Sequence, residues 1–396
     1  MSTAATSKSK SKNTPKPAFT PAGMTVSKAW QRGDGEMLYS FTSAPQATAK
    51  AAAAATPANR RKNALTALKT TGAPAWPLVQ QAARVTIRPT ERKPSKWSSA
   101  APGNRLAMFC ADPQIGFRMD DLGNIDPFHD EAAMALFVTA VRIEQPDVIA
   151  ILCDYLDLPG QGKFAQEARF AQTAQHTFNR GYSWLAELRA AAPRAEIILI
   201  EGNHDRRLQN FVEANALSAF GLRRADLPGE EMPKGWPVMS LPHLLRLDSL
   251  DIAYIDAYPA ATHWLNDDTR AIHGTKANSS GSTMAAYLND LPFLNTWAGH
   301  THRQEIVWKT TTGRHGATLR YAANPGALCR TDGAVPSVNG AIGIDGKPAK
   351  VWEAWQQGFG LLRFNETQSF PELVPIVNGQ AVMNGQLLSA VELLAA

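Results

Sequence analysis

Five short clusters of Asp, Asn, Gln and His, each directly after an apolar run, have the residue types of a metal site. In chain order they are DPQ (112–114), CDYLD (153–157), GNHD (202–205), IHG (272–274) and GHTH (299–302). Carboxylate, amide and imidazole groups suit Mn²⁺, Fe²⁺, Zn²⁺ or Ni²⁺, whereas a structural zinc site favours thiolates. A lone Asp after a strand is usually a helix N-cap. Several carboxylates brought together repel one another, and divalent cations remove that repulsion.

The segments between the clusters predict strands and helices that bring the clusters to one edge of a sheet. The runs 106–110, 147–153 and 195–200 are apolar and indicate buried strands, whereas 129–145 and 164–192 have helical spacing. This alternation predicts βαβ units with parallel strands. Ligands of open α/β sheets bind at the carboxyl ends of the strands, which is where the clusters stand.

Composition predicts a division of the 396 residues into four parts. Residues 1–20 are rich in Lys, Ser and Thr and are expected to be disordered. Residues 21–104 are expected to form a hairpin at 24–43 followed by an Ala/Pro/Lys-rich linker. The main domain is expected at 105–376, and 377–396 is expected to be a C-terminal extension.

Charge is distributed unevenly along the chain. Residues 1–100 hold sixteen basic and three acidic residues, a balance of +13, although the whole chain carries only +5. A basic arm of this kind can bind nucleic acid or another polyanion through counterion release. The alternative is a solvated tail that has no partner.

The remaining composition excludes several classes of protein. No apolar run is long enough to span a membrane, and the first seventeen residues, MSTAATSKSKSKNTPKP, lack the apolar region of a secretory signal. The three cysteines, Cys110, Cys153 and Cys329, are few and widely separated, which favours buried thiols over a disulfide framework. A cytoplasmic protein without membrane contact is therefore expected.

The order and spacing of the five clusters resemble the calcineurin-like metallophosphoesterases. That family's signature is Asp-x-His, Gly-Asp-x-x-Asp, Gly-Asn-His-Asp/Glu, a lone His and Gly-His-x-His. The resemblance covers about residues 105–330, and the strands to about 376 would finish the second sheet. It implies an α/β fold, a two-sheet α/β/β/α sandwich, here with a basic and partly disordered N-terminal arm. A chain with such an arm also resembles copies that are common in phage genomes.

The resemblance implies two divalent metal ions, Mn, Fe, Zn or Ni, with Mn²⁺ favoured in vitro. Asp154 would bridge both ions. Asp112 and His302 would complete one metal site, and the other would be completed by Asn203, His273 and His300. Gln114 stands where the family's first His is usual, so one site is expected to bind its ion more weakly. Cys153 replaces the usual glycine before Asp154 and is interpreted as a buried structural thiol.

The resemblance also implies roles for charged residues around the metals. His204 would be the general acid that protonates the leaving oxygen, Asp205 would orient it, and Asp157 would support the site. Arg206 or its neighbour Arg207 could contact substrate phosphate, as could Arg303. Solvated helix or loop positions explain these arginines equally well.

A metal-dependent hydrolase of phosphoric ester bonds is therefore the expected function. Metal-bound hydroxide would attack the phosphorus, and the basic arm favours a phosphodiesterase or nuclease. One alternative is a phosphomonoesterase that acts on nucleotides or phosphoproteins. Another is a nucleic-acid-binding or assembly module whose metal site has decayed, for which Gln114 is the only support. No feature of the sequence specifies the oligomeric state.

Overall fold

Two compact units, Met1–Leu78 and Val79–Ala396, make up the chain in the computed structural model. The structure describes residues 24–31, 37–43, 79–87, 93–120, 122–162, 168–223, 235–278, 282–314, 316–336 and 354–390. In the first unit, β1 (Met24–Gln31) pairs antiparallel with β2 (Met37–Ser43), which is the hairpin expected at 24–43. The disorder expected for residues 1–20 concerns residues outside the described ranges.

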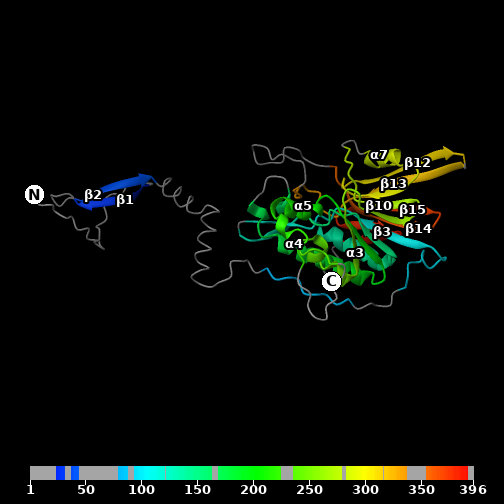
Figure 1. Cartoon of the computed structure of the whole chain (residues 1–396), viewed down its shortest axis with the longest axis horizontal. Helices are drawn as coiled ribbons and strands as arrows, with labels where there is room; N and C mark the ends of the chain where they lie inside the picture. The colour runs from blue at the N-terminus through cyan, green and yellow to red at the C-terminus, as the bar shows by residue number, and fades with distance from the viewer. Residues whose placement is uncertain are drawn as a thin grey trace, which may run out of the picture. The chain divides into compact units, whose positions relative to one another are not determined.

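An eight-stranded mixed sheet forms the centre of the second unit (Figure 1). Its order is β17-β16-β15-β14-β3-β6-β7-β8, and β3, β6, β7 and β8 run parallel. The parallel strands are β3 (Arg105–Cys110), β6 (Val148–Ile151), β7 (Glu196–Ile200) and β8 (Ile252–Ile255). The antiparallel half consists of β14 (Gln357–Phe364), β15 (Ser369–Val377), β16 (Gln380–Met383) and β17 (Gln386–Ser389).

A five-stranded sheet faces the first and has the order β12-β13-β11-β10-β9. Its strands are β9 (Thr262–Asn266), β10 (Thr269–Ile272), β11 (Asn295–Ala298), β12 (Gln304–Gly313) and β13 (Gly316–Pro325). β10, β11 and β13 are parallel, and the two outer strands are antiparallel to their neighbours. β4 (Phe117–Met119) and β5 (Ile125–Pro127) form a separate two-stranded antiparallel sheet.

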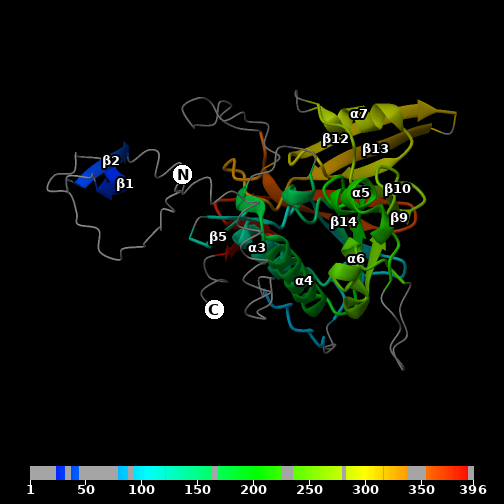
Figure 2. The same ribbon diagram turned by 60° about the vertical axis from the view of Figure 1, so that its left-hand side comes forward.

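Helices cover the outer faces of the two sheets (Figure 2). Among the described residues, the α-helices are α3 (Glu131–Glu144), α4 (Ala174–Ala191), α5 (Arg206–Asn215), α6 (Leu241–Leu244) and α7 (Thr283–Asp290). Short 3₁₀ turns are η1 (Pro159–Gln161), η2 (Ala168–Phe170), η3 (Leu217–Ala219) and η4 (Leu247–Leu250). Asp130 caps the N-terminus of α3, where its carboxylate accepts hydrogen bonds from the amides of Ala132 and Ala133.

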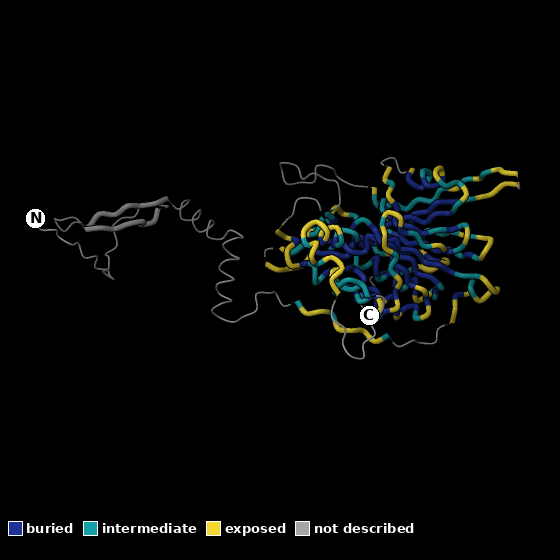
Figure 3. The backbone as a smooth tube through the Cα atoms, viewed as in Figure 1, coloured by how far each residue is buried: buried dark blue, intermediate teal, exposed yellow. Residues whose placement is uncertain are grey.

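Buried residues are concentrated in the strands of the second unit (Figure 3), and three of the buried clusters lie between successive layers of a sandwich. Along β3, Met108 faces the core under the helices, while Phe109 faces the core between the sheets. There Phe109 stacks on Trp297 of β11, with ring centroids 4.1 Å apart. α7 packs Met284 against the outer face of the smaller sheet. The predicted α/β/β/α sandwich is therefore confirmed.

At both ends of the expected main domain, segments that were expected to lie outside it pack against it or pair with its sheet. Residues 93–104 were expected to belong to a linker, yet the Ser98 hydroxyl donates to Asp147 at 2.5 Å and Trp97 packs against Phe370. At the other end, the expected extension contributes β16 and β17 to the larger sheet. Composition missed the packing because Pro- and Ser-rich segments can lie against a core without contributing many apolar residues. The proposed domain boundaries themselves stay a prediction.

No helix in the described part of the chain combines the length and the apolar character needed to cross a membrane.

Candidate metal centre

The carboxyl ends of strands from both sheets meet at one place. Cys110 of β3 lies opposite Ile151 of β6, and Ile151 lies opposite Leu199 of β7, so these three strands end in register. In the other sheet, Ile272 of β10 lies opposite Ala298 of β11. The polar cluster that follows each strand is therefore brought to the same edge. Each of these five ends is followed by at least one residue predicted as a ligand: Asp112 and Gln114, Asp154, Asn203, His273, and His300 and His302.

Two groups of three side chains share the carboxylate of Asp154. One group is Asp154, His273 and His300; the other is Asp112, Asp154 and His302. Within each group, the potential ligand atoms all lie within 4.8 Å of one another. Asp112, Asp154, His273 and His302 are buried, and His300 is half-buried. One shared carboxylate with separate imidazoles is an arrangement that can hold two cations side by side.

The chemistry of this donor set fits divalent cations. Asp112 Oδ1 is buried without a hydrogen-bond donor, while Asp112 Oδ2 accepts the amide of His300 at 2.9 Å. Asp112 Oδ1 lies 3.4 Å from His302 Nε2, and Asp154 Oδ1 lies 3.4 Å from His273 Nε2. A buried carboxylate oxygen without a donor is costly unless a cation binds it. The residues present therefore fit a pair of metal ions.

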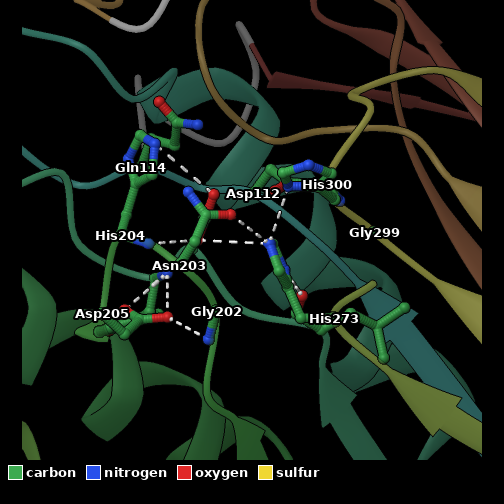
Figure 4. Close-up of polar contacts among 12 residues, drawn as sticks. Asp112, Gln114, Gly202, Asn203, His204, Asp205, His273, Gly299 and His300 are labelled. Carbon is green, nitrogen blue, oxygen red and sulfur yellow. Dashed lines mark hydrogen bonds and ion pairs between the residues drawn. The ribbon is translucent and has the colours of Figure 1, made fainter. Parts of the chain in front are cut away.

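The imidazole of His273 is oriented by the main chain (Figure 4). Its Nδ1 lies 2.7 Å from the carbonyl oxygen of Leu152, which can only accept, so Nδ1 carries the proton. Nε2 is the ring nitrogen that faces the other predicted ligands. It lies 3.1 Å from Asn203 Oδ1 and 3.2 Å from His300 Nδ1. A backbone carbonyl that fixes the tautomer is a common support for metal-binding histidines.

Strained backbone accompanies the predicted ligands. Positive φ angles occur at Asp112 (49°), Gln114 (44°), Cys153 (24°), Asp154 (51°), His300 (74°) and His302 (55°). Non-glycine residues rarely adopt this region, and such conformations cluster at functional sites. Hydrogen bonds between the loops hold the strain: Asp112 N–H donates to the Cys153 carbonyl at 2.9 Å, and Gln114 N–H to the Asp154 carbonyl at 3.0 Å.

Two glycines allow the loops to come this close. A Cβ atom at Gly202 would overlap both the backbone nitrogen and the Oδ1 atom of Asp154. A Cβ at Gly299 would lie 2.9 Å from the Cβ of Ala111 and 3.0 Å from the Leu152 carbonyl. The Gly-Asn-His and Gly-His-x-His clusters therefore need glycine because a side chain has no space there.

Gln114 lies at the centre, beside His302. Its Nε2 is 3.0 Å from His302 Nε2, the imidazole nitrogen that also faces Asp112. The other nitrogen of His302 lies 3.8 Å from Cys329 Sγ, and the ring packs at 4.1 Å between centroids against Trp355. The side chain of Gln114 is thus next to a potential metal ligand, and its own role as a ligand stays a prediction.

Burial and neighbouring charges set the protonation of these groups. Burial raises the pKa of Asp112 well above its usual value, and Asp154 adds to the effect. Burial also acts on Asp154, but the imidazoles of His204 and His273 outweigh it and lower that pKa. Burial and the nearby His273 lower the pKa of His300 to about 4. At neutral pH, Asp154 is therefore ionised and His300 is neutral, as ligands must be.

The carboxylate beside the His204 imidazole belongs to Asp157 and not to Asp205. Asp205 was expected to orient this imidazole, but its carboxylate accepts the backbone amides of Gly202, Tyr155 and Leu156 at 3.0–3.2 Å. Figure 4 shows Asp205 joined by dashed lines to backbone nitrogens. Asp157 is the carboxylate beside the ring, with Oδ1 3.4 Å from His204 Nδ1. Asp205 therefore ties the turn after β7 to the turn after β6.

Arg206 and Arg303 each contact a residue other than the predicted metal ligands. Arg206 Nη2 lies 3.4 Å from Glu213 Oε1, which belongs to the same helix, α5. The arginine beside His204 is Arg207. Arg303 donates to the carbonyl oxygen of Asn278 at 3.1 Å and so braces the loop after β10. A substrate contact by Arg303 stays a prediction.

Two further residues shape the centre, and only one had a signal in the sequence. Asn324 is buried, and its amide donates to the Gly299 carbonyl and to Thr301 Oγ1 at 2.9 and 3.0 Å. It thereby holds the loop that carries His300 and His302. The turn motif Asn324-Pro325-Gly326 could have indicated it. Tyr258, whose ring lies 5.8 Å from that of His273, follows no motif.

Comparison with known proteins gives distant relatives. No protein-family model matches the chain. It is 28% identical over 270 residues to "Gene 54 protein" of Mycobacterium phage D29, covering 66% of this chain and 94% of that protein. It is 24% identical over 272 residues to "Gene 54 protein" of Mycobacterium phage L5, with the same two coverages. The expected likeness to phage-encoded chains is thus found.

Solved structures of similar arrangement include two Vps29 proteins. A double mutant of Vps29 from Entamoeba histolytica is 12% identical with a TM-score of 0.28, covering 72% of this chain and 96% of that one. Vacuolar Protein Sorting 29 from Cryptosporidium parvum is 10% identical with a TM-score of 0.30, covering 72% and 98%. Likenesses this low say nothing about the chemistry of the centre.

Proposed function

We propose that this chain is a metal-dependent phosphoesterase of the calcineurin-like type that hydrolyses phosphodiesters. The observation that carries the proposal is the Asp154 carboxylate, which belongs to both groups of potential metal ligands. A single site would need only one of these groups. Two groups that share a buried carboxylate instead match the chemistry of two cations acting on one phosphorus centre.

The residues that would hold the ions come from both sheets. Asp112, Gln114 and His302 would bind one ion, Asn203, His273 and His300 the other, and Asp154 both. When bound, two divalent cations supply Lewis acidity toward phosphoryl oxygens and lower the pKa of water. Mn²⁺, Fe²⁺, Zn²⁺ and Ni²⁺ all suit oxygen and imidazole ligands, and Mn²⁺ is our choice for assays.

We assign to His204 the protonation of the leaving group. Its imidazole is buried, 3.7 Å from Asp154 Oδ2 and 3.4 Å from Asp157 Oδ1. Burial lowers its pKa, but the charges of Asp154 and Asp157 outweigh burial and raise it. A raised pKa favours an imidazole that can donate a proton near neutral pH, as a general acid must.

The basic arm favours diesters, and within them nucleic acid. Sixteen basic residues among the first hundred would contribute to the binding of a polyanionic substrate. The competing candidate is a phosphomonoesterase, which the metal ligands would serve equally well. Activity at the centre also separates both enzymes from a binding module with a decayed site.

Hydrolysis of two aryl substrates tests the proposal. We expect the full chain with Mn²⁺ to hydrolyse bis-(p-nitrophenyl) phosphate faster than p-nitrophenyl phosphate, and to lose this activity with EDTA. Asp154→Ala should abolish it. Asp268→Ala is a matched control, because this exposed carboxylate precedes β10 and pairs with Arg320 instead. Preference for the monoester would favour the phosphomonoesterase. Activity on neither, with tight binding of DNA, would favour the binding module.

A further inference from the structure

Arg207, one of the two neighbouring arginines that the sequence offered as a phosphate contact, is a mostly buried cation beside the centre. It lies in the first turn of α5, and its side chain is 14% exposed. Its Nη1 donates to Asp157 Oδ1, and its Nη2 lies 2.7 Å from His204 Nε2. The guanidinium thus bridges a carboxylate and the imidazole that we propose as the proton donor.

The contact with Arg207 occupies Nε2 of the His204 ring. A guanidinium has only donors, so His204 Nε2 must accept this hydrogen bond. The other ring nitrogen, Nδ1, faces Asp157. A nitrogen that accepts from Arg207 cannot at the same time donate to a leaving oxygen. Arg207 therefore has to leave Nε2, and Nε2 has to take up a proton from water, before this nitrogen can protonate a leaving oxygen.

An anionic phosphoryl group is the acceptor that could replace His204. Guanidinium binds phosphoryl oxygens with two parallel N–H donors, and such charge-assisted bonds are stronger than a bond to a neutral imidazole. The phosphorus centre would be near at hand, because His204 Nε2 lies only 3.7 Å from Asp154 Oδ2. Asp157 would keep its hold on Arg207 through Nη1 during the exchange.

We propose that Arg207 is a substrate-binding residue that exchanges His204 Nε2 for a non-bridging phosphoryl oxygen, and so frees His204 when an anionic phosphate ester binds. The proposal rests on the proposed function of the same centre. It names the ligand class as an anionic phosphoryl group, so neutral phosphotriesters are not expected to release His204.

Arg206 provides a matched control on the same helix. It is the preceding residue and carries the same group, but it contacts Glu213. Removing either guanidinium takes one positive charge from α5. Only the loss of Arg207 should alter binding at the centre.

Titration of the full chain with inorganic phosphate tests the binding step without catalysis. Isothermal titration is done with Mn²⁺ and again with EDTA on wild type, Arg207→Met, Arg207→Lys and Arg206→Met. We expect Arg207→Met to bind phosphate about tenfold or more weakly. Arg207→Lys should lie between, and Arg206→Met should match wild type. Less than a twofold difference between Arg207→Met and wild type in both conditions would overturn the proposal.

Kinetics separate substrate binding from a merely structural role. With bis-(p-nitrophenyl) phosphate, Arg207→Met should raise KM more than it lowers kcat, and added guanidinium chloride should restore part of kcat/KM. A variant that fails only through misfolding would not be rescued, and absence of rescue would count against the proposal. If wild type hydrolyses nothing, the proposed function fails, while the phosphate titration still decides the role of Arg207.

Discussion

The Oδ2 atom of Asp112 accepts the backbone N–H of His300 at 2.9 Å, although the two residues are 188 positions apart. This bond joins the loop after the first strand of the larger sheet to the loop after β11 of the smaller one. It leaves Oδ1 of the same carboxylate without a donor. The two sheets therefore meet through a residue that also offers an oxygen to a cation.

Asp154→Asn should remove the shared ligand while keeping the side-chain volume. We expect the affinity for Mn²⁺ to fall about 100-fold or more, since even supporting residues around metals cost up to that much. Mn²⁺ should raise the melting temperature of wild type and leave that of the variant unchanged, as measured by differential scanning calorimetry. An equal shift in both proteins would remove Asp154 from the metal site.

His204→Ala should affect substrates according to their leaving group. General acid catalysis contributes about 100-fold to 10,000-fold, and most where the leaving oxygen is basic. We therefore expect a large loss on a dinucleoside phosphodiester and a small loss on bis-(p-nitrophenyl) phosphate. Rates for both substrates with saturating Mn²⁺ check this. Equal losses would argue against proton donation by His204.

Asp205→Asn should change the pH dependence of stability in metal-free protein. Burial, together with the charge of Asp154, raises the pKa of Asp205 from 3.8 to about 7. The folded state then binds this proton more tightly than the unfolded chain does. The stability due to this carboxyl is thus fully present below about pH 4 and is lost as pH rises to about 7.

Urea unfolding of both proteins between pH 4 and 8, in EDTA, measures this contribution as a difference. The free energy of unfolding of wild type relative to Asp205→Asn should fall with increasing pH across that window. A difference that does not depend on pH would mean that Asp205 titrates alike in both states.

Gly202→Ala should displace Asp154, because the new Cβ would overlap its backbone nitrogen and Oδ1. A shift of a ligand by about 1 Å can cost about 100-fold in rate. We expect Mn²⁺-dependent hydrolysis to fall by about that factor. Gly313→Ala is the control, since a Cβ there meets nothing within 4 Å. Equal activity of the two variants would show that the turn after β7 can relax.

Deleting residues 1–78 should separate polyanion binding from turnover. The cut is made before Val79 because residues 93–104 pack on the sandwich through Trp97 and Ser98. We expect weaker DNA binding with a smaller dependence on salt, because fewer counterions are released. Turnover of bis-(p-nitrophenyl) phosphate should stay unchanged. Fluorescence anisotropy at several salt concentrations gives the slope, and an unchanged slope would make the arm a bystander.

The sequence by itself determined the sheet edges and the kinds of ligand. Apolar runs that end in Asp, Asn or His predict buried strands with polar carboxyl ends, and all five of those ends converge in the structure. Glycine at 202 and 299 also belonged to the pattern, because space between loops is required there.

Only the tertiary structure decided which of two adjacent residues in a motif faces the metal centre. Successive residues on a helix point about 100° apart, so Arg206 and Arg207 look alike in sequence and yet contact Glu213 and His204 respectively. Asp205 turned to backbone amides and Asp157 to His204, because the paths of two loops set these directions. Contacts between distant segments, such as Asn324 with Gly299, leave no local periodicity to read.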